Sequence, residues 1–309
     1  MMSPFLLLLN RELMRQSTNH VMMIKPAEFY ANPQTAETNA YQAEGGAAND
    51  QILAAALVEY EGYKQVLTDN GVKVTEGMGI VGSPDMIFPN WFFTHESGEL
   101  ILCPMLNENR QAERTPEIIE TLSALYPNVV DWTAHEKDGR ALESTASIVS
   151  DHVNKRCYAA LSSRTDADLA QKWADHRGYK LMLFETHSHK GIPVYHTDCV
   201  MWIGTTLAGI CDPVIDDGGG DKLVGRLEDT HEVVRFTAAQ LRTFCGNALE
   251  VLGPKGEKFL AISDGAVKSL SEEQFELIDA HFDQVLSAPL GTMEKYGGGS
   301  ARCMIAELF

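Results

Sequence analysis

The stretch Gly297-Gly298-Gly299-Ser300-Ala301-Arg302-Cys303-Met304 places a cysteine four residues after a glycine run, close to the end of the 309-residue sequence. Glycine lets the backbone approach a ligand closely, so we expect the Cys303 thiol to be reachable and polarised by backbone N–H groups. The alternative is a flexible tail in which Cys303 is one more buried cysteine that acts as a small hydrophobe. The residues of this stretch alone support both interpretations about equally.

A second polar motif, Tyr195-His196-Thr197-Asp198-Cys199, lies upstream and leads into an apolar run. In extended backbone, side chains two positions apart point to the same face, so His196 and Asp198 would face one site together. A histidine beside a carboxylate is a common acid or base in catalysis, although a single histidine near a strand is more often structural. The nearby His187 and His189 complete no ligand spacing typical of a metal centre, so we expect no metal.

Four further segments carry polar residues that could join these two motifs. Taken singly, each would be interpreted as a turn, a helix cap or a solvated charge. The candidate residues in these segments are Asp85 and Asn90 (83–91), Arg110 and Arg114 (107–114), Glu143 (141–146) and Arg164 (161–166).

Apolar periodicity predicts strands that alternate with helices along the sequence, which indicates a single domain of the α/β class. Helices are expected at 49–70, from Thr115 with its capping residue and proline, at 166–176, after Thr237, and from Ser271 with a capping-box pattern. The stretch 218–220, with acidic neighbours, is interpreted as an exposed loop. Strands are expected at 21–25, 72–74, 86–88, 91–94, 100–103, 129–132, 147–150, 158–161, 181–184, 200–203, 258–262 and 285–289.

The composition indicates which partners this protein avoids and in which cellular compartment it is expected. A net charge of -18 disfavours nucleic acid and anionic membranes, because both are recognised through Lys and Arg. The six cysteines show no C-x-x-C spacing, which is typical of reduced thiols in the cytoplasm rather than of a disulfide framework. Residues 1–21 are expected to form a poorly ordered extension that precedes the folded domain at 22–309.

The candidate segments occur in a familiar order. Pro-Asp-x-x-Phe-Pro-Asn, Asn-Arg-x-x-Glu-Arg, the segment of Glu143, Ser-x-Arg-Thr, His-x-Asp and Gly-Gly-Ser-x-Arg-Cys follow one another along residues 22–309. This order resembles the guanidino-group-modifying superfamily of arginine deiminases, dimethylargininases and glycine amidinotransferases, and is most similar to its citrulline-utilisation hydrolase branch. The sequence departs from the pattern at Ser144, where relatives often carry glycine, and before Trp91, where one asparagine is missing.

The resemblance implies a pentein fold, a five-bladed α/β propeller with one catalytic site in its centre and no cofactor. It implies that Cys303 is the nucleophile, His196 the proton shuttle and Glu143 the residue that orients the site. The residues that it implies for substrate binding are Asp85 and Asp198 at the guanidino or ureido head, Asn90 beside them, and Arg164, with Arg110 or Arg114, at the carboxylate.

Three functions fit this resemblance. The first is hydrolysis of arginine, methylarginine or citrulline at the guanidino or ureido carbon through a covalent cysteine intermediate. Asn90 stands where arginine deiminases and dimethylargininases usually carry aspartate, and its amide can donate as well as accept, which slightly favours a ureido substrate. The alternatives are amidino transfer to an acceptor amine and ligand binding without catalysis. The expected partners are such an amino acid and, among macromolecules, a second copy of this chain.

Overall fold

The computed structural model describes residues 15–309 except residue 44, and it contains five three-stranded sheets that share one strand pattern. In each sheet the central strand pairs antiparallel with one neighbour and parallel with the other. The sheets are β15 (Ala306–Glu307), β1 (His20–Lys25) and β2 (Lys73–Met78); β3 (Phe92–His95), β4 (Glu99–Leu102) and β5 (Asn128–Asp131); β6 (Val149–Asp151), β7 (Arg156–Ala160) and β8 (Lys180–Phe184); β9 (Met201–Ile203), β10 (Leu207–Ile210) and β11 (Glu232–Arg235); β12 (Leu249–Leu252), β13 (Lys258–Ser263) and β14 (Gln284–Ala288).

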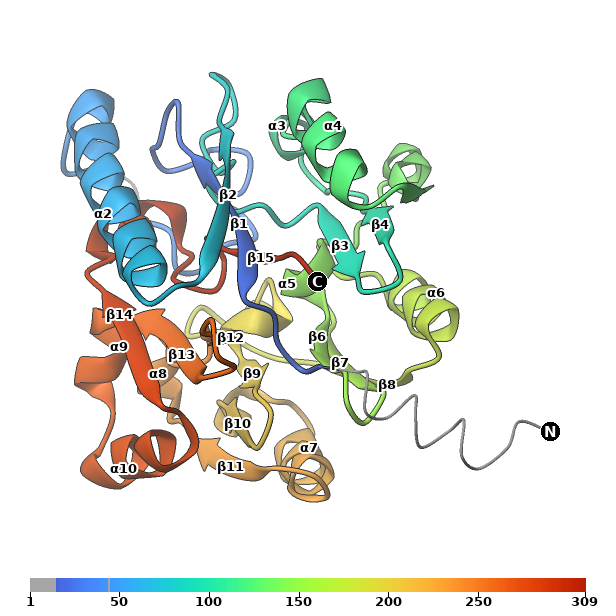
Figure 1. Ribbon diagram of the computed structural model, residues 1–309, viewed down its shortest axis with the longest axis vertical. Helices are drawn as coiled ribbons and strands as arrows, with labels where there is room; N and C mark the ends of the chain where they lie inside the picture. Colours follow the sequence, from blue (N-terminus) through green and yellow to red (C-terminus); the bar gives the residue numbers. More distant parts are fainter. Residues whose placement is uncertain (1–14, 44) are drawn as a thin grey trace.

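A helical connection joins the two parallel strands of each sheet, as such a crossover requires. Figure 1 shows these helices towards the outside of the molecule and the strands nearer to its centre. The crossover helices are α2 (Asn49–Asp69), α3 (Glu108–Gln111), α4 (Pro116–Leu125), α6 (Ala167–Arg177), α7 (Gly219–Glu228), α9 (Asp264–Ser269) and α10 (Glu272–His281). The remaining helical segments are α5 (Ser144–Ser147), α8 (Ala238–Leu241), η1 (Thr133–Asp138), η2 (Thr197–Cys199), η3 (Asp212–Val214) and η4 (Met293–Gly297).

The two ends of the described chain meet in the first sheet. Val21 of β1 pairs with Glu307 of β15, antiparallel, so the stretch that precedes β15 enters the core. Cys303 is 1% exposed and packs in one apolar cluster with Tyr63 of α2 and Val251 of β12. The glycine-cysteine stretch is therefore a packed part of the fold, and the flexible-tail alternative is wrong.

Local sequence starts several helices where it predicts them. Thr115 accepts a hydrogen bond from the backbone N–H of Ile118, and proline occupies the first turn of α4. Ser271 and Gln274 form a capping box at the start of α10. These caps satisfy N–H groups that have no partner within their own helix. The predictions of both helix starts are confirmed.

Two local predictions are wrong. The stretch 218–220 opens helix α7: Gly218 caps it at φ 67° and Gly220 is buried. A Cβ at Gly220 would lie 2.7 Å from the carbonyl oxygen of Asp212, so only glycine permits this close packing. In the sequence, a glycine that is needed for packing looks the same as a glycine in a loop. Residues 86–88 form a turn rather than a strand, which aims their side chains inward.

The folded domain begins before Met22. Residues 1–14 of the expected extension lie outside the described residues, whereas Gln16, Ser17 and Thr18 are buried. The Thr18 hydroxyl donates a 2.7 Å hydrogen bond to the carbonyl oxygen of Leu308, which ties the start of the described chain to its end. The extension therefore does not reach residue 21.

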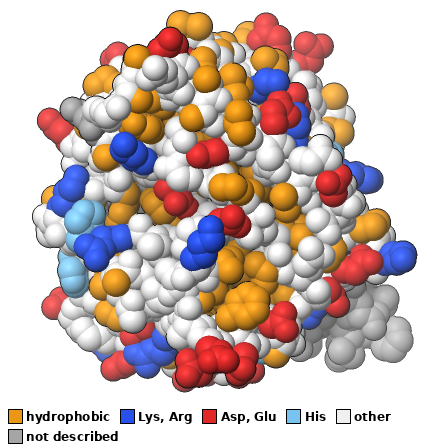
Figure 2. Space-filling view, turned by 90° about the vertical axis from the view of Figure 1, so that its left-hand side faces the viewer, with side chains coloured by type: hydrophobic (Ala, Val, Ile, Leu, Met, Phe, Trp, Pro, Cys, Tyr) orange, Lys and Arg blue, Asp and Glu red, His pale blue; other side chains and the backbone are white. Residues whose placement is uncertain are grey.

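The surface mixes charges of both signs. On the face drawn in Figure 2, acidic, basic and apolar side chains are interspersed, without one continuous patch of a single sign. Within residues 15–309, leaving out residue 44, no helix has the length and apolar character needed to cross a membrane.

Candidate active site

One small cavity gathers most of the predicted site residues. Its volume is about 10 Å³, which is room for about one water molecule. Asn39, Phe88, Tyr195, Gly297 and Gly299 form part of its wall. The lining residues that the sequence predicts for the site are Asp85, Asn90, Arg110, Arg164, His196 and Cys303.

The glycine run lets the cavity wall close around the thiol. A Cβ at Gly297 would come within 2.6 Å of the Phe88 ring, and one at Gly298 within 2.6 Å of the Asn39 amide. Gly298 also has a φ of 60°, which L side chains rarely adopt. The glycines therefore permit close packing against protein groups, and the approach of their backbone to a ligand stays a prediction.

Asn247 contacts the sulfur of Cys303 with one end of its amide and the nearby backbone with the other. Its Nδ2 atom donates to Sγ of Cys303 at 3.1 Å, while its Oδ1 atom accepts from the backbone N–H groups of Arg302 and Cys303 at 3.1 and 3.3 Å. Asn247 is completely buried, so these contacts are shielded from water. Sequence reasoning missed this residue, since one asparagine between two loops carries no recognisable spacing.

Hydrogen bonds favour the thiolate form of Cys303. The neighbouring Cys199 thiol, whose effect outweighs burial and is aided by the Ser300 backbone and Asn247, lowers the pKa of Cys303 to about 6. Burial, and then the charge on Cys303, raise the pKa of Asp198 well above its ordinary value. Since two adjacent buried groups cannot both carry negative charge cheaply, the charge rests on the sulfur.

Asp198 is placed differently from its expected position. Thr197–Cys199 form the 3₁₀ turn η2 rather than extended backbone, so Asp198 and His196 do not share a face in the predicted manner. Asp198 does not line the cavity; its Oδ2 atom instead lies 3.6 Å from Sγ of Cys303. Asp198 thus belongs to the surroundings of the Cys303 thiol.

Glu143 and His196 form a buried pair behind the cavity. Glu143 is the N-cap residue of α5, whereas the sequence placed it at the start of a strand, and its side chain is completely buried. Although burial alone would raise its pKa, the charge of Arg164 and the hydrogen bond from His196 lower the pKa of Glu143 to about 2. The ionised carboxylate accepts from Nε2–H of His196, which leaves the lone pair on Nδ1. Nδ1 is buried without a hydrogen-bond partner among the described residues.

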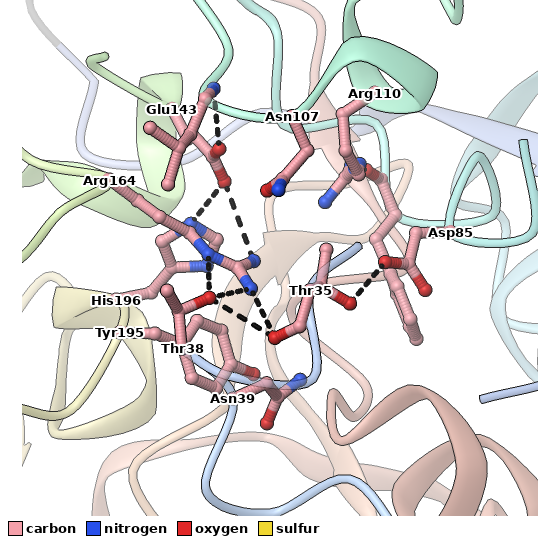
Figure 3. Close-up of polar contacts among 12 residues, drawn as sticks. Thr35, Thr38, Asn39, Asp85, Asn107, Arg110, Glu143, Arg164, Tyr195 and His196 are labelled. Atoms are coloured by element: carbon pink, nitrogen blue, oxygen red, sulfur yellow. Dashed lines mark hydrogen bonds and ion pairs between the residues drawn. The ribbon is translucent and has the colours of Figure 1, made fainter. Parts of the chain in front are cut away.

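Arg164 lies between this pair and the loop that covers the cavity (Figure 3). Its Nη2 atom donates to Oγ1 of Thr38 at 2.7 Å, and its Nη1 atom lies 3.7 Å from Oε2 of Glu143. The guanidinium also stacks over the Tyr195 ring at 4.9 Å. The side chain is 2% exposed, so its charge acts within the site rather than at the surface.

Asp85 and Arg110 occupy the opposite wall (Figure 3). Oδ2 of Asp85 accepts from Asn32 at 2.8 Å, whereas Oδ1 is buried without a partner among the described residues. Arg110 is committed to a buried ion pair: its Nε and Nη2 atoms donate to the two carboxylate oxygens of Glu113 at 2.6 and 3.1 Å. Asp85 therefore offers a free acceptor to a ligand, while Arg110 has a partner already.

A polar loop, residues 32–42, covers the cavity; we name it the cover segment. Besides Asn32 on Asp85 and Thr38 on Arg164, Nδ2 of Asn39 donates to the carbonyl oxygen of Gly297 at 3.0 Å. Its sequence is rich in Asn, Gln and Thr, which predicts only a loop. Sequence reasoning therefore missed its contact with the site.

Three other residues lie away from the cavity. Arg114 pairs with Glu136 at 2.8 Å and does not line the cavity, unlike its expected position. His187 hydrogen-bonds with Asp216 in a half-exposed pair, and His189 packs against Tyr41. Neither histidine lines the cavity.

Comparisons with solved structures establish the fold. The N-terminal domain of ArgZ, an arginine dihydrolase from cyanobacteria crystallised with substrate, is 16% identical with a TM-score of 0.73, covering 93% of this chain and 97% of that one. AgrE in a complex with ornithine and NAD+ is 16% identical with a TM-score of 0.72, and the match covers 94% of this chain and 39% of that one. DDAH from Pseudomonas aeruginosa in a complex with citrulline is 14% identical with a TM-score of 0.66, and the match covers 94% of this chain and 100% of that one. This chain shares their mixed α/β fold.

Sequence comparison identifies the family. No curated protein sequence matches this chain. The sequence model described as N,N dimethylarginine dimethylhydrolase, eukaryotic, matches residues 25–309, which is nearly the whole chain. The ordered motifs and the shared fold agree with this match, and the resemblance to the guanidino-group-modifying superfamily is confirmed. The chain therefore belongs to the N,N dimethylarginine dimethylhydrolase family of that superfamily.

Proposed function

We propose that this chain hydrolyses a C–N bond at the guanidino or ureido carbon of an arginine-like amino acid, with Cys303 as nucleophile. The observation that carries the proposal is a low-pKa thiol and a Glu143–His196 pair at one cavity. The family match adds support. An intact set of these groups also argues against a protein that only binds ligand.

The chemistry divides into two displacements. The Cys303 thiolate attacks the central carbon of the substrate head while His196 is in its imidazolium form, and the departing nitrogen takes the proton that Nδ1 carries in that form. Water then attacks the covalent adduct, gives its proton to the same nitrogen of His196, and releases the thiolate. Glu143 holds the ring through Nε2–H and stabilises the imidazolium form each time it appears.

Substrate groups would meet the charged walls of the cavity. The free Oδ1 atom of Asp85 suits an N–H group of the head, with Asn90 beside it and Asp198 behind the nucleophile. Arg164 suits the α-carboxylate, since its planar guanidinium can donate two parallel hydrogen bonds. Arg110 would contribute through its ion pair with Glu113 rather than by direct contact, whereas Arg114 pairs with Glu136 outside the cavity and would take no part in binding.

Binding requires the cover segment to move. A cavity of about 10 Å³ admits about one water molecule and not an amino acid. Thr38 bonds Arg164 and Asn32 bonds Oδ2 of Asp85, so Arg164 and this second carboxylate oxygen become free when residues 32–42 move away. Closure afterwards would exclude bulk water from the covalent adduct.

We extend the proposal to the architecture. The five sheets of one pattern are the blades of a pentein propeller, formed by a single catalytic domain that starts before Met22. In four sheets the central strand forms a hairpin with one partner and a crossover with the other, and in the first sheet β15 takes the place of the hairpin strand, which is consistent with five repeats. Six free cysteines are consistent with a cytoplasmic protein.

A substrate panel tests the function. Arginine, citrulline, agmatine and mono- and dimethylarginine are incubated with the protein, and products are identified by mass spectrometry. We expect release of ammonia or a methylamine without any acceptor amine, and no release by Cys303→Ser, because an alcohol is far less ionised than a thiol. Turnover only with an added amine would replace hydrolysis by amidino transfer, and unchanged turnover by Cys303→Ser would overturn the nucleophile.

A further inference from the structure

A second thiol lies beside the nucleophile. The Sγ atoms of Cys199 and Cys303 and a carboxylate oxygen of Asp198 all lie within 4.8 Å of one another. Both cysteines are free and buried. Of the six cysteines, all in the described part of the chain, only Cys303 lines the cavity. The mechanism above gives Cys199 no step, although its thiol lowers the pKa of Cys303.

The two thiols differ in reactivity. Cys303 has a pKa lowered to about 6, mainly by the neighbouring Cys199 thiol. Burial, followed by the contact with Cys303, raises the pKa of Cys199 well above its ordinary value. The thiolate is the form that attacks an oxidant. Cys303 is therefore the group that reacts first, while Cys199 keeps its proton and stays reduced nearby.

The closed cavity selects by size. It has room for about one water molecule, so an amino acid cannot enter while the cover segment holds Arg164 and Asp85. Hydrogen peroxide is only slightly larger than water. A small peroxide can thus approach Cys303 through fluctuations that would not admit an amino acid.

We propose that Cys199 and Cys303 form a peroxide-sensitive thiol pair, in which Cys199 resolves oxidised Cys303 as a disulfide. The Cys303 thiolate attacks one oxygen of hydrogen peroxide, the O–O bond breaks, and the leaving hydroxide becomes water; Cys303 is oxidised to a sulfenic acid. The Cys199 sulfur then attacks the sulfenic sulfur, the S–O bond breaks, and the hydroxyl leaves as water with the Cys199 proton. Two thiols and one peroxide give one disulfide and two water molecules.

Geometry permits the second step with side-chain movement. A disulfide requires the sulfurs to approach to about 2.05 Å. They start within 4.8 Å of each other, so the two sulfurs must approach by less than 3 Å, roughly, for the bond to form. Nδ2 of Asn247 donates hydrogen bonds to Sγ of Cys303 and to the carbonyl oxygen of Asp198. These contacts hold the backbone segments of Cys199 and Cys303 close to each other.

The consequence rests on the proposed function: a disulfide removes the nucleophile and switches the hydrolase off until a dithiol reduces it. The pair also protects Cys303, because a sulfenic acid without a resolving thiol is oxidised irreversibly. The redox reaction itself does not depend on the identity of the substrate.

The test treats the reduced full-length chain with hydrogen peroxide. We expect the intact mass to fall by two hydrogens, peptide mapping to find Cys199 linked to Cys303, and dithiothreitol to restore the mass. In Cys199→Ser we expect a sulfenic acid that dimedone traps and that advances to sulfinic acid, which dithiothreitol does not reverse. Cys245→Ser is the matched control, since its sulfur already contacts the Thr243 and Ser269 hydroxyls and serine fits there; it should form the same link as the wild type.

Two results would overturn the pair: a link between other cysteines, or reversible oxidation of Cys303 that is equal in the wild type and in Cys199→Ser. Because mass and mapping need no turnover, a Cys199–Cys303 link in a protein that hydrolyses nothing would leave the thiol pair standing and reject the proposed function. A protein that hydrolyses substrate but forms no Cys199–Cys303 link would support the proposed function and reject the thiol pair.

Discussion

The Nε2 atom of His196 lies 2.7 Å from the Oε2 atom of Glu143, and both side chains are almost completely buried. This contact determines which ring nitrogen can move a proton. Since the carboxylate accepts from Nε2–H, the lone pair of the neutral ring is on Nδ1, which has no partner in the described chain. A buried imidazole with one satisfied and one free nitrogen is arranged as an acid–base group.

Glu143→Gln should lower kcat about a hundredfold or more, because the amide cannot stabilise the imidazolium form and can select the wrong tautomer. The KM should change much less. Steady-state kinetics on the best substrate of the panel measure both values, and circular dichroism checks that the variant is folded. A variant with near wild-type kcat would remove Glu143 from the catalytic set.

The reactivity of Cys303 should follow a pKa of about 6. The thiolate is present above this pH and is lost as the pH falls through it, so alkylation by iodoacetamide and kcat/KM should both decline on the acid side near pH 6. Alkylation is followed by inactivation rate and by mapping of the modified cysteine. A midpoint near the ordinary thiol value of about 8.5 would contradict the hydrogen-bonded thiolate.

Asn247→Asp should raise the pKa of Cys303. The change keeps the acceptor for the backbone N–H groups but replaces the Nδ2 donor, 3.1 Å from Sγ, by a carboxylate oxygen. Loss of a charge-assisted hydrogen bond costs about 1.5–3 kcal/mol, which corresponds to roughly one to two pKa units.

The alkylation profile of Asn247→Asp measures this shift. Asn128→Asp, which adds the same charge at an exposed position, is the control and should keep the wild-type profile. An unshifted midpoint in Asn247→Asp would limit Asn247 to a structural role.

Arg164→Lys should raise the KM for amino-acid substrates about tenfold or more, since one bidentate contact is worth roughly 1.5–3 kcal/mol and 1.4 kcal/mol is tenfold. Agmatine, which has no carboxylate, should show little change in KM. Arg164 also lies 3.7 Å from Glu143, so a common decrease of kcat on both substrates is expected from the weaker support of that carboxylate.

Arg114→Lys serves as the control because Arg114 is an ion-paired arginine outside the cavity, and its KM values should stay unchanged. An equal rise of the KM for arginine and for agmatine in Arg164→Lys would mean that Arg164 does not bind the substrate carboxylate.

Activity should survive metal removal. A thiolate, an imidazole and a carboxylate supply nucleophile, acid–base group and orientation without an ion. Among the described residues, Asp198, Cys199 and Cys303 have the spacing of a metal site, but a metal there would occupy the nucleophile. Assays after dialysis against a chelator, with elemental analysis, check this. Stoichiometric zinc whose removal abolishes turnover would refute it.

Sequence patterns predicted the site residues that belong to short motifs. Cys303, His196, Asp85 and Arg164 meet at one cavity, and Glu143 supports His196. The same patterns did not separate Arg110 and Arg114, which share one motif. Arg110 reaches the cavity wall and Arg114 turns to Glu136, because the short helix α3 and the turn after it aim them differently.

Local patterns were enough to predict the α/β class, the helix starts at Thr115 and Ser271 and the motifs that form the candidate site, because caps, periodicity and motif spacing act within a few residues. The groups around the Cys303 thiol could not be predicted in this way. Asn247, Cys199 and the cover segment are brought to Cys303 by contacts between segments far apart in the chain, including the pairing of β1 with β15. Such contacts depend on the packing of all five sheets, and no local pattern encodes them.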